Sequence, residues 1–412
     1  MTMIKQLGTF DVDNYGDLLY PLIVQRILQN HEVKQNVLWY SLLPGEAPLQ
    51  AGFETHPART LFAASSAVPC KLIIGGGDLL RTDRNLIAQH YGGRSRRSYG
   101  MLRRSLGTRR LPGYFLQRVV PRLDADSYHA KRFIARWMDY PAGGPFLINP
   151  DDLPPGSTVF YLSCGVPHNF LPAESEQVKR TLDRASFIYL RDEQSAEKLR
   201  RAGVSRQITV APDIAVTLSD QFEHAEQVQR GRAILSGFGI DAGRPVLCFQ
   251  SKPYTDFSVD EILRQLKRYQ ERTQSEIVLL PTGYCHGDHE LLQRLGKQSG
   301  GTLKYAGVHS VFDMISIIAA SNLFIGTSLH GNITAFSYGI PHLFGPLPVD
   351  KAEGFLKITG LPAELKLDSW SEISDKINMI SKLPPAFFSQ RARSAKAEAY
   401  RAVNNLLNAL RQ

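Results

Sequence analysis

Short apolar stretches alternate along the chain with longer segments in which apolar residues recur at helical spacing. The strand-like stretches are residues 4–10, 37–42, 71–74, 158–164, 187–190, 245–250, 276–281, 303–306 and 323–325. The helix-like segments include residues 17–30, 173–185, 259–273, 311–320 and 386–410. Because strands that alternate with helices form parallel sheets, the pattern predicts an α/β protein. We expect two Rossmann-like domains whose parallel sheets face a cleft.

The length of 412 residues is sufficient for two domains that each bury a core. We predict an N-terminal Rossmann-like domain over residues 1–219 and a C-terminal one over residues 244–385. The weak hydrophobic pattern of residues 220–243 is typical of a linker, and residues 386–412 are expected to form a long terminal helix.

The most informative turn follows the apolar residues 323–325, where Gly326, Thr327 and Ser328 precede a helix-like segment. In a parallel sheet this turn lies at the carboxyl edge, where ligands bind, and free amides at a helix start attract anions. Thr327 or Ser328 is expected to cap the helix. His330, at the same turn, is suited to proton transfer near neutral pH. The alternative is an ordinary turn in which the imidazole bonds to a backbone carbonyl.

Two further turns in the N-terminal half carry candidate site residues. Asn14 and Asp17 follow the first apolar stretch, and Asp17 is either a general base or an acid that interacts favourably with the helix dipole. Gly75, Gly76 and Gly77 follow another apolar stretch and allow the backbone to approach a ligand closely. They do not form the GxGxxG fingerprint, so a nicotinamide or flavin cofactor is disfavoured.

The net charge of +9 is concentrated in one segment. Residues 81–140 contain fourteen Arg or Lys and four Asp, so the net positive charge of this basic segment is larger than that of the whole chain. Arginines alternate there with leucines and aromatic residues. This pattern indicates either a solvated insertion or a surface for polyphosphates and anionic lipid headgroups. Nucleic acid is disfavoured, because no recognised binding motif accompanies the charge.

The cysteines and the chain ends indicate a cytoplasmic protein. Cys70, Cys164, Cys248 and Cys285 are far apart and form no CxxC pair, which favours reduced thiols over disulfides or a zinc cluster. The first residues carry no signal region, and no apolar run reaches the roughly 18 residues of a membrane span. A metal site in residues 286–289 is disfavoured, because the spacing of its histidines and aspartate matches no helical HExxH motif.

Several turns together resemble the polysaccharide pyruvyltransferase family, and the similarity covers most of the chain outside the basic segment. The matching pieces are residues 14–17, 75–77, 188–195, Pro212-Asp213, residues 326–330, Ala335, Pro341, Lys351 and Gly354-Phe355. Two positions depart from the family pattern. Many relatives carry Arg-x-His where this chain has Ser328-Leu329-His330, and a Gly-x-Gly-Pro loop where it has residues 165–168.

The resemblance implies transfer of the carboxyvinyl unit of phosphoenolpyruvate to a sugar, commonly as a pyruvate ketal, without a metal or another cofactor. It leaves Arg191 as the strongest ligand for the anionic donor, with Lys351 as a second cation. The turn at Thr327, Ser328 and Leu329 would supply helix N-terminal amides. Residues 75–77 complete the implied binding set.

The same resemblance assigns the proton transfers. His330 is implied as the acid that protonates the methylene carbon of the donor, and Asp17 as the base that accepts a proton from the sugar hydroxyl. Asn14 would orient the sugar. The implied acceptor is a lipid- or nucleotide-linked precursor of a cell-surface polysaccharide, and the basic segment would face the inner membrane surface or the carrier pyrophosphate.

Two other classes remain open at this level. A nucleotide-sugar-dependent glycosyltransferase would share the anion-binding turns and the fold, because the two expected Rossmann-like domains resemble the GT-B glycosyltransferase architecture. A non-catalytic sugar-binding homologue would retain the fold without the arginine that Ser328 replaces.

Overall fold

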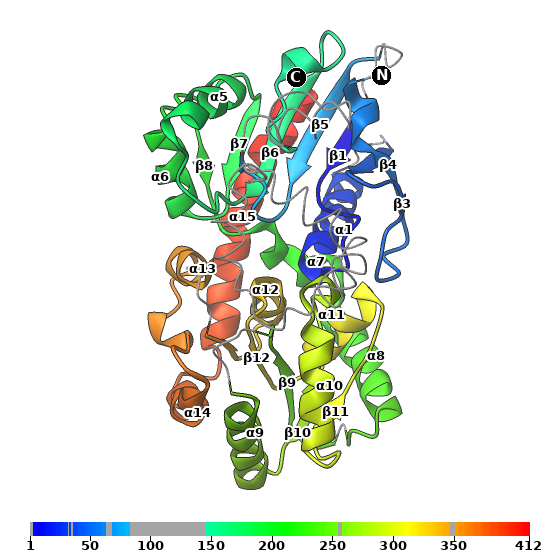
Figure 1. Ribbon diagram of the computed structural model, residues 1–412, viewed down its shortest axis with the longest axis vertical. Coiled ribbons are helices and arrows are strands. Elements are labelled where there is room, and N and C mark those ends of the chain that lie inside the picture. Colours follow the sequence, from blue (N-terminus) through cyan, green and yellow to red (C-terminus); the bar gives the residue numbers. More distant parts are fainter. Residues whose placement is uncertain are drawn as a thin grey trace, which may run out of the picture.

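The computed structural model describes residues 3–31, 33, 36–62, 68–82, 145–241, 243–253, 258–346 and 351–412. These residues form two sheets, each with helices packed against it (Figure 1). The first sheet has the order β3-β4-β2-β1-β5-β6-β7-β8, and its pairs are parallel except for β3 with β4. Its strands are β1 (Met3–Leu7), β2 (Val37–Ser41), β3 (Gly45–Glu46), β4 (Glu54–Pro57), β5 (Cys70–Gly75), β6 (Thr158–Cys164), β7 (Phe187–Leu190) and β8 (Thr209–Val210).

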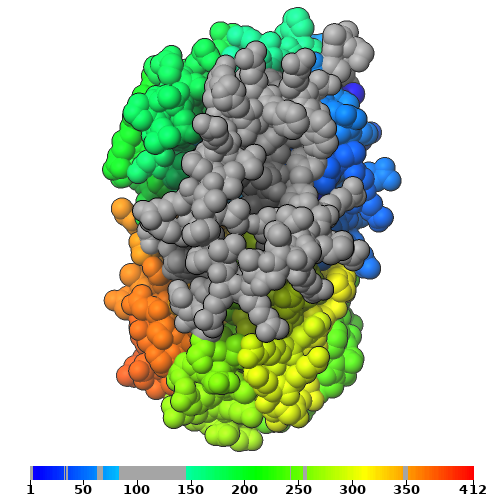
Figure 2. Space-filling model, in the orientation of Figure 1, coloured from blue at the N-terminus to red at the C-terminus, as the bar shows by residue number. Residues whose placement is uncertain are grey.

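The second sheet is parallel throughout and has the order β11-β10-β9-β12-β13. Its strands are β9 (Val246–Gln250), β10 (Glu276–Leu279), β11 (Lys304–Tyr305), β12 (Leu323–Gly326) and β13 (His342–Phe344). The predicted α/β class with two mainly parallel sheets is therefore confirmed. On the face in Figure 2, the blue and green residues of the first half lie at one end, and the yellow and orange residues of the second half lie toward the other.

The helices connect and cover the strands, as the alternating pattern predicts. They are α1 (Tyr15–Asn30), α5 (Pro172–Leu182), α6 (Glu193–Arg201), α7 (Leu218–Gln221), α8 (His224–Gly237), α9 (Val259–Thr273), α10 (Asp288–Gln298), α11 (Val311–Ala319), α12 (Leu329–Ser337), α13 (Lys351–Thr359), α14 (Ile373–Ile380) and α15 (Phe387–Arg411). Short 3-10 helices are η1 (Ala58–Phe62), η3 (Pro150–Asp152), η4 (Ile214–Thr217), η5 (Tyr284–His286), η6 (Ala363–Leu365) and η7 (Trp370–Glu372).

Residues 220–243, which were predicted to be a linker, contain helix α8. This helix packs against α11, and a Cβ atom added at Gly231 would lie 2.1 Å from the carbonyl oxygen of Ser316. The small residue allows the two helices to approach closely, and Gln227 accepts a hydrogen bond from Ser316 Oγ at 2.7 Å. Residues 220–243 thus contribute to the helix layer of the second half.

The terminal helix α15 connects the two halves of the molecule. In Figure 1 it runs in red from the region of α14 past α13 to the first sheet. It contacts α12 and α13 as well as η4 and β7. The Lys71 ammonium donates a hydrogen bond to the Leu410 carbonyl at the far end of the helix. The buried face of α15 consists of Phe388, Ala392, Ala395, Ala399, Ala402, Val403, Leu406, Leu407 and Leu410.

Each sheet has one point at which the order of its strands reverses. In the first sheet the chain passes from β1 to β2 on one side and later places β5 on the other. In the second sheet β10 and β11 lie on one side of β9, and β12 lies on the other. Open parallel sheets bind ligands outside the carboxyl ends of strands at such switch points. The fold therefore points to two short regions, one after β1 and β5 and one after β9 and β12.

Candidate functional site

The carboxyl edges of the two sheets meet directly. Asn14, after β1, forms an isolated β-bridge with Gly283, after β10. The Tyr15 amide donates to the Thr282 carbonyl at 2.8 Å, and the Cys285 amide donates to the Asp13 carbonyl at 3.2 Å. Loops at the carboxyl edges of both sheets therefore lie against each other, as expected for two facing sheets. The predicted cleft itself stays a prediction.

His330 lies in this junction, in the first turn of α12, and is 9% exposed. Its Nε2 atom is 2.8 Å from the hydroxyl oxygen of Tyr20 on α1 and 3.7 Å from Asp213 Oδ2. The opposite side of the ring contacts α1, where a Cβ atom added at Gly16 would lie 2.2 Å from His330 Nδ1. The imidazole is thus held between a helix of one half and a helix of the other.

The hydrogen-bond chain through Tyr20 determines which ring nitrogen carries a proton. Burial raises the pKa of the Tyr20 hydroxyl well above its ordinary value, and the nearby Asp213 carboxylate raises it further. The hydroxyl therefore stays protonated and donates to Asp213 Oδ2 at 2.7 Å. Because a phenol has one hydrogen, its oxygen accepts from His330, which places a proton on Nε2. The nitrogen left for another partner is Nδ1, beside Gly16.

Asp213 is ionised despite its burial. Burial alone would raise the pKa of its carboxyl, but the hydrogen bond and charge of His330, the Arg191 guanidinium and the Ala215 amide hold it below the ordinary value. Asp213 is 1% exposed and caps η4 through the Ala215 amide. A fixed buried carboxylate therefore stands behind the imidazole.

Arg191, at the carboxyl end of β7, reaches the same carboxylate from the other side. Its Nη1 atom is 3.7 Å from Asp213 Oδ2, its Nε atom is 3.9 Å from Asp192 Oδ2, and its Nη2 atom is 2.5 Å from Asp78 Oδ1. The structure thus places the predicted guanidinium near the predicted imidazole. However, Arg191 is only 7% exposed and is surrounded by three carboxylates, so its role as the anion ligand stays a prediction.

Lys351, the first residue of α13, also pairs with Asp78. Burial would raise the pKa of the Asp78 carboxyl, but Lys351 and Arg191 lower it well below the ordinary value. Asp78 therefore links two cations that come from different halves of the chain. Gly165 leaves room for this group, because a Cβ atom there would lie 2.6 Å from Asp78 Oδ1.

The three glycines at the end of β5, Gly75 to Gly77, are needed for protein contacts. Gly76 and Gly77 have φ angles of +94° and +80°, which residues other than glycine rarely adopt. A Cβ atom at Gly76 would lie 2.2 Å from the Tyr20 ring, and one at Gly77 would lie 3.1 Å from Asp17 Oδ1. At Gly75 the nearest atom would be the Leu162 carbonyl oxygen at 3.0 Å. Their predicted contact with substrate stays a prediction.

The turn after β12 is built as predicted, with Ser328 as the capping residue. Its Oγ atom accepts from the Gly331 amide at 3.2 Å. The Ser328 amide and the Thr327 hydroxyl both donate to Gln250 Oε1, at 2.8 and 3.2 Å. Leu329 is partly buried against the core. Gln250 thus ties the end of β9 to the end of β12 at the second switch point.

Asn14 and Asp17 face each other at the start of α1. The Asn14 amide nitrogen donates to Asp17 Oδ2 at 2.8 Å, and both side chains are partly exposed. Asp17 follows Gly16, the residue that contacts His330, so the predicted acid and base lie on neighbouring parts of the same junction.

Sequence reasoning did not assign roles to several residues of the junction. Asp78 directly follows the three glycines, and Asp213 belongs to the Pro-Asp pair, so their positions carried a signal. Tyr20 lies on the buried face of α1, where the pattern alone indicates core packing. Lys252 and Asp288, beside Gln250, carried no recognisable motif.

The remaining sequence predictions concern metals, thiols and the basic segment. Among the described residues, no group of three or more His, Cys, Asp or Glu side chains is placed to hold a metal. Cys70, Cys164 and Cys248 are buried free thiols, and Cys285 is partly exposed. No helix in the described ranges is long and apolar enough to span a membrane. The basic segment, residues 81–140, lies outside the described residues except for Arg81 and Thr82.

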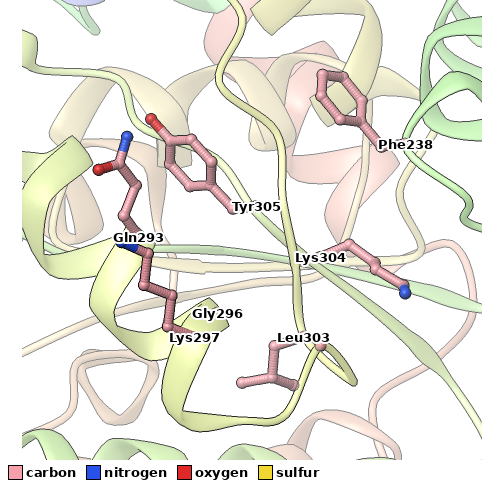
Figure 3. Close-up of a pocket in the computed structure, with 8 residues that line it drawn as sticks. Phe238, Gln293, Gly296, Lys297, Leu303, Lys304 and Tyr305 are labelled. Atoms are coloured by element: carbon pink, nitrogen blue, oxygen red, sulfur yellow. The ribbon is translucent and has the colours of Figure 1, made fainter.

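A surface hollow elsewhere does not share the features of the junction. Figure 3 shows it beside α10 and the edge strand β11. Its lining consists of Phe238, Gln293, Gly296, Lys297, Gly301, Leu303, Lys304 and Tyr305. Gln293, Gly296 and Lys297 lie in the second half of α10, away from the carboxyl ends of the strands. The junction is therefore the candidate site.

The architecture is found in several solved structures. HepE from Anabaena, in complex with UDP and glucose, is similar over 100% of both chains, with a TM-score of 0.52 and 11% identity. UDP-N-acetylglucosamine 2-epimerase from Rickettsia bellii is similar over 100% of this chain and 96% of its own, with a TM-score of 0.56 and 9% identity. UDP-GlcNAc 2-epimerase from Neisseria meningitidis, bound to UDP-GlcNAc, is similar over 99% of this chain and 100% of its own, with a TM-score of 0.54 and 12% identity.

These likenesses and the two mainly parallel sheets define an α/β protein with a GT-B-like fold. The profile of the family described as "Polysaccharide pyruvyl transferase" matches residues 129–344, and the chain belongs to this family. A search of curated proteins gave no match.

Proposed function

We propose that the protein transfers the pyruvyl unit of phosphoenolpyruvate to a sugar of an exopolysaccharide or of its carrier-linked precursor. The observation that carries the proposal is the position of His330. Its imidazole lies where the two carboxyl edges meet, and its Nε2 atom bonds to Tyr20 beside an ionised Asp213. Family membership indicates the reaction type, and this arrangement supplies an acid of the required kind.

The donor has a phosphate and a carboxylate, so its site must offer cations and amide hydrogens. The Ser328 and Gly331 amides are already bonded within the protein. Among the described hydrogen bonds, the Leu329 and His330 amides have no acceptor, and they begin a helix of nine residues. These amides bind one anionic end of the donor, and the Arg191 and Lys351 cations, both paired with Asp78, lie at the carboxyl edge of the first sheet.

The protonation step uses the Nδ1 side of the imidazole. The imidazolium of His330 keeps its Nε2 hydrogen bond to the Tyr20 hydroxyl and donates the Nδ1 proton to the methylene carbon. As this C–H bond forms, C2 gains oxocarbenium character and a sugar hydroxyl adds to it. Asp17 accepts the hydroxyl proton, and Asn14 orients the sugar.

The second half of the reaction forms the ketal. A neighbouring hydroxyl of the sugar bonds to C2 while the C2–O bond to phosphate breaks, and the hydroxyl proton passes to the departing phosphate oxygen. Inorganic phosphate leaves with the bonding electron pair. The balance is one donor and one diol converted to one ketal and one phosphate, with no oxidant, reductant, metal or other cofactor.

The acceptor is a sugar attached to a lipid or nucleotide carrier, and the protein acts in the cytoplasm, peripheral to the inner membrane face. The support is the local positive charge of residues 81–140, which is suited to anionic headgroups or to a carrier pyrophosphate.

The direct test incubates the protein with phosphoenolpyruvate and a panel of carrier-linked sugars. The expected result is an acceptor that gains the mass of a pyruvyl group together with release of phosphate, both abolished in His330→Ala. Product formation at the wild-type rate in His330→Ala would exclude the imidazole as the acid. Absence of product with every acceptor, despite tight sugar binding, would instead favour a non-catalytic homologue.

A second candidate is a nucleotide-sugar-dependent glycosyltransferase. It is favoured by the fold shared with HepE, which was solved with UDP and glucose. Thermal unfolding separates the two candidates, because a ligand that binds only the folded state raises its melting temperature. Stabilisation by phosphoenolpyruvate and not by UDP supports the pyruvyltransferase, and the reverse result supports the glycosyltransferase.

A further inference from the structure

Lys252 lies at the second switch point and has no role in the scheme above. It follows the central strand β9, and its backbone amide donates to Thr327 Oγ1 at 3.0 Å. Gln250, two residues earlier, bonds to the Ser328 amide on one side and to Asp288 Oδ2 on the other. The lysine backbone is therefore fixed against the turn that carries His330.

The ammonium of Lys252 differs from the two predicted cations in its partners. Arg191 and Lys351 both pair with Asp78. Within the described part of the chain, no carboxylate oxygen lies within 4.0 Å of the Lys252 ammonium. The side chain is nevertheless only partly exposed to solvent. A partly shielded ammonium without a close counter-ion is costly unless a ligand supplies the charge.

Four titratable groups face this ammonium from other elements: Asp288 on α10, Lys351 on α13, Cys285 on η5 and Asp17 on α1. Burial lowers the pKa of Lys252; Asp288 opposes this effect, and Lys351 adds to it. Burial raises the pKa of the Cys285 thiol to about 12, so the thiol is neutral around pH 7–9. Lys252 thus shares its surroundings with the predicted base and with one predicted cation.

Asp288 is the buried carboxyl group that opposes the lowering of the Lys252 pKa. It is 0% exposed, and its Oδ2 atom accepts from Gln250 Nε2 at 2.5 Å and from the Gly283 amide at 2.9 Å. Its Oδ1 atom is buried and has no hydrogen-bond partner among the described residues. One buried carboxylate at longer range offsets only part of the cost of the ammonium.

We propose that Lys252 is the cation that binds the phosphate group of the donor, between the carboxyl ends of β9 and β12. The inference deepens the proposed function and rests on it for the identity of the donor. A phosphate at this position lies against the start of α12, where the Leu329 and His330 amides also donate hydrogen bonds to it.

Binding of phosphoenolpyruvate, measured by isothermal titration calorimetry without acceptor, tests the assignment. Lys252→Gln is expected to weaken binding by roughly ten- to a hundredfold, the usual effect of losing a charge-assisted hydrogen bond. Lys252→Arg is expected to restore most of the affinity. The matched control is Lys297→Gln, an exposed lysine on α10 remote from the junction, which should bind as the wild type does.

The pH profile gives a second readout that a structural lysine would not produce. Wild-type affinity should fall as the pH rises through the lowered pKa of Lys252, because the phosphate binds the ammonium form. Arginine stays charged, so Lys252→Arg should keep its affinity over that range. In the absence of ligand, Lys252→Gln should unfold at the same temperature as the wild type or higher, and a marked decrease would contradict the proposal.

The outcomes separate this inference from the proposed function. Wild-type binding of phosphoenolpyruvate that is unchanged in Lys252→Gln overturns the role of Lys252 and leaves the function in place. Binding of UDP or inorganic phosphate that depends on Lys252, without binding of phosphoenolpyruvate, supports the phosphate site and overturns the donor. If the wild type binds none of the three compounds, both proposals fail.

Discussion

At the scale of single residues, Gly16 on α1 packs directly against the His330 ring and so joins the two halves. The Cα of Gly16 is so near the ring that a methyl group would overlap Nδ1 at 2.2 Å. This contact cannot be read from the sequence, because the two residues are more than three hundred positions apart. The position requires glycine for space, since its φ angle is not in the left-handed region.

Gly16→Ala is therefore expected to displace His330 and to lower the rate of pyruvyl transfer by at least about tenfold. Overpacking of this kind also costs about 1–3 kcal/mol of stability. Phosphate release and urea unfolding measure the two effects. Gly237→Ala, at the end of α8, is the control, because no atom lies within 4 Å of the added Cβ. Wild-type activity in Gly16→Ala would contradict the proposed role of the His330 position.

The carboxylate of Asp213 leads to a prediction about pH. Its pKa is lower in the folded protein than the value of about 3.9 expected for the unfolded chain. Its contribution to stability is therefore complete above that value and is lost as the pH falls through the folded-state pKa. We expect the free energy of unfolding to fall less between pH 5 and pH 3 in Asp213→Asn than in the wild type.

Urea unfolding at several pH values measures this difference. Asp375→Asn, an exposed carboxyl on α14, serves as the control and should follow the wild-type profile. An Asp213→Asn profile parallel to that of the wild type would show that Asp213 is not held ionised by its neighbours.

At the scale of elements, helix α15 is expected to stabilise the whole molecule, since it contacts both halves. Leu407 is 3% exposed, so Leu407→Ala should cost about 2–5 kcal/mol of stability. The exposed neighbour Asn405→Ala should change stability by no more than about 0.5 kcal/mol. Chemical denaturation measures both. Equal effects of the two variants would argue against packing of α15 across the halves.

Strands and long helices were predictable because their apolar positions repeat with the period of the element. The bounds predicted for β6, β7 and α9 agree with the structure. Helix α8 was missed because only Gln227, Gly231 and Leu235 of it are buried, so a single leucine supplies the apolar pattern. Its packing depends on the small size of Gly231, which a hydrophobic pattern does not record.

At the scale of the whole molecule, the charge of residues 81–140 predicts attraction to an anionic membrane surface. Reversing Arg94, Arg96, Arg97, Arg103 and Arg104 to Glu is expected to abolish sedimentation with vesicles that contain phosphatidylserine. Vesicles of phosphatidylcholine alone should not bind either protein. Raising the salt from about 0.05 to 0.5 M should weaken wild-type binding, because counter-ions screen the charges.

The control for this experiment changes the net charge equally at other sites. It reverses five exposed cations, which are Arg268, Arg294, Lys297, Arg401 and Arg411. Loss of vesicle binding in this control as well would show that total charge, and not the basic segment, determines the attraction.

The sequence by itself determined the α/β class, the succession of strands and helices, and the turns where His330, Asp17 and Arg191 lie. Local period and turn chemistry suffice for these features, because they depend on residues close together in the chain. Only the tertiary structure decided the partners of these residues. The pairing of His330 with Tyr20 and Asp213, the enclosure of Arg191 by carboxylates, and the position of Lys252 beside Thr327 all depend on how loops at the carboxyl edges of the strands pack together. Such contacts join positions far apart in sequence, and burial then fixes their charges.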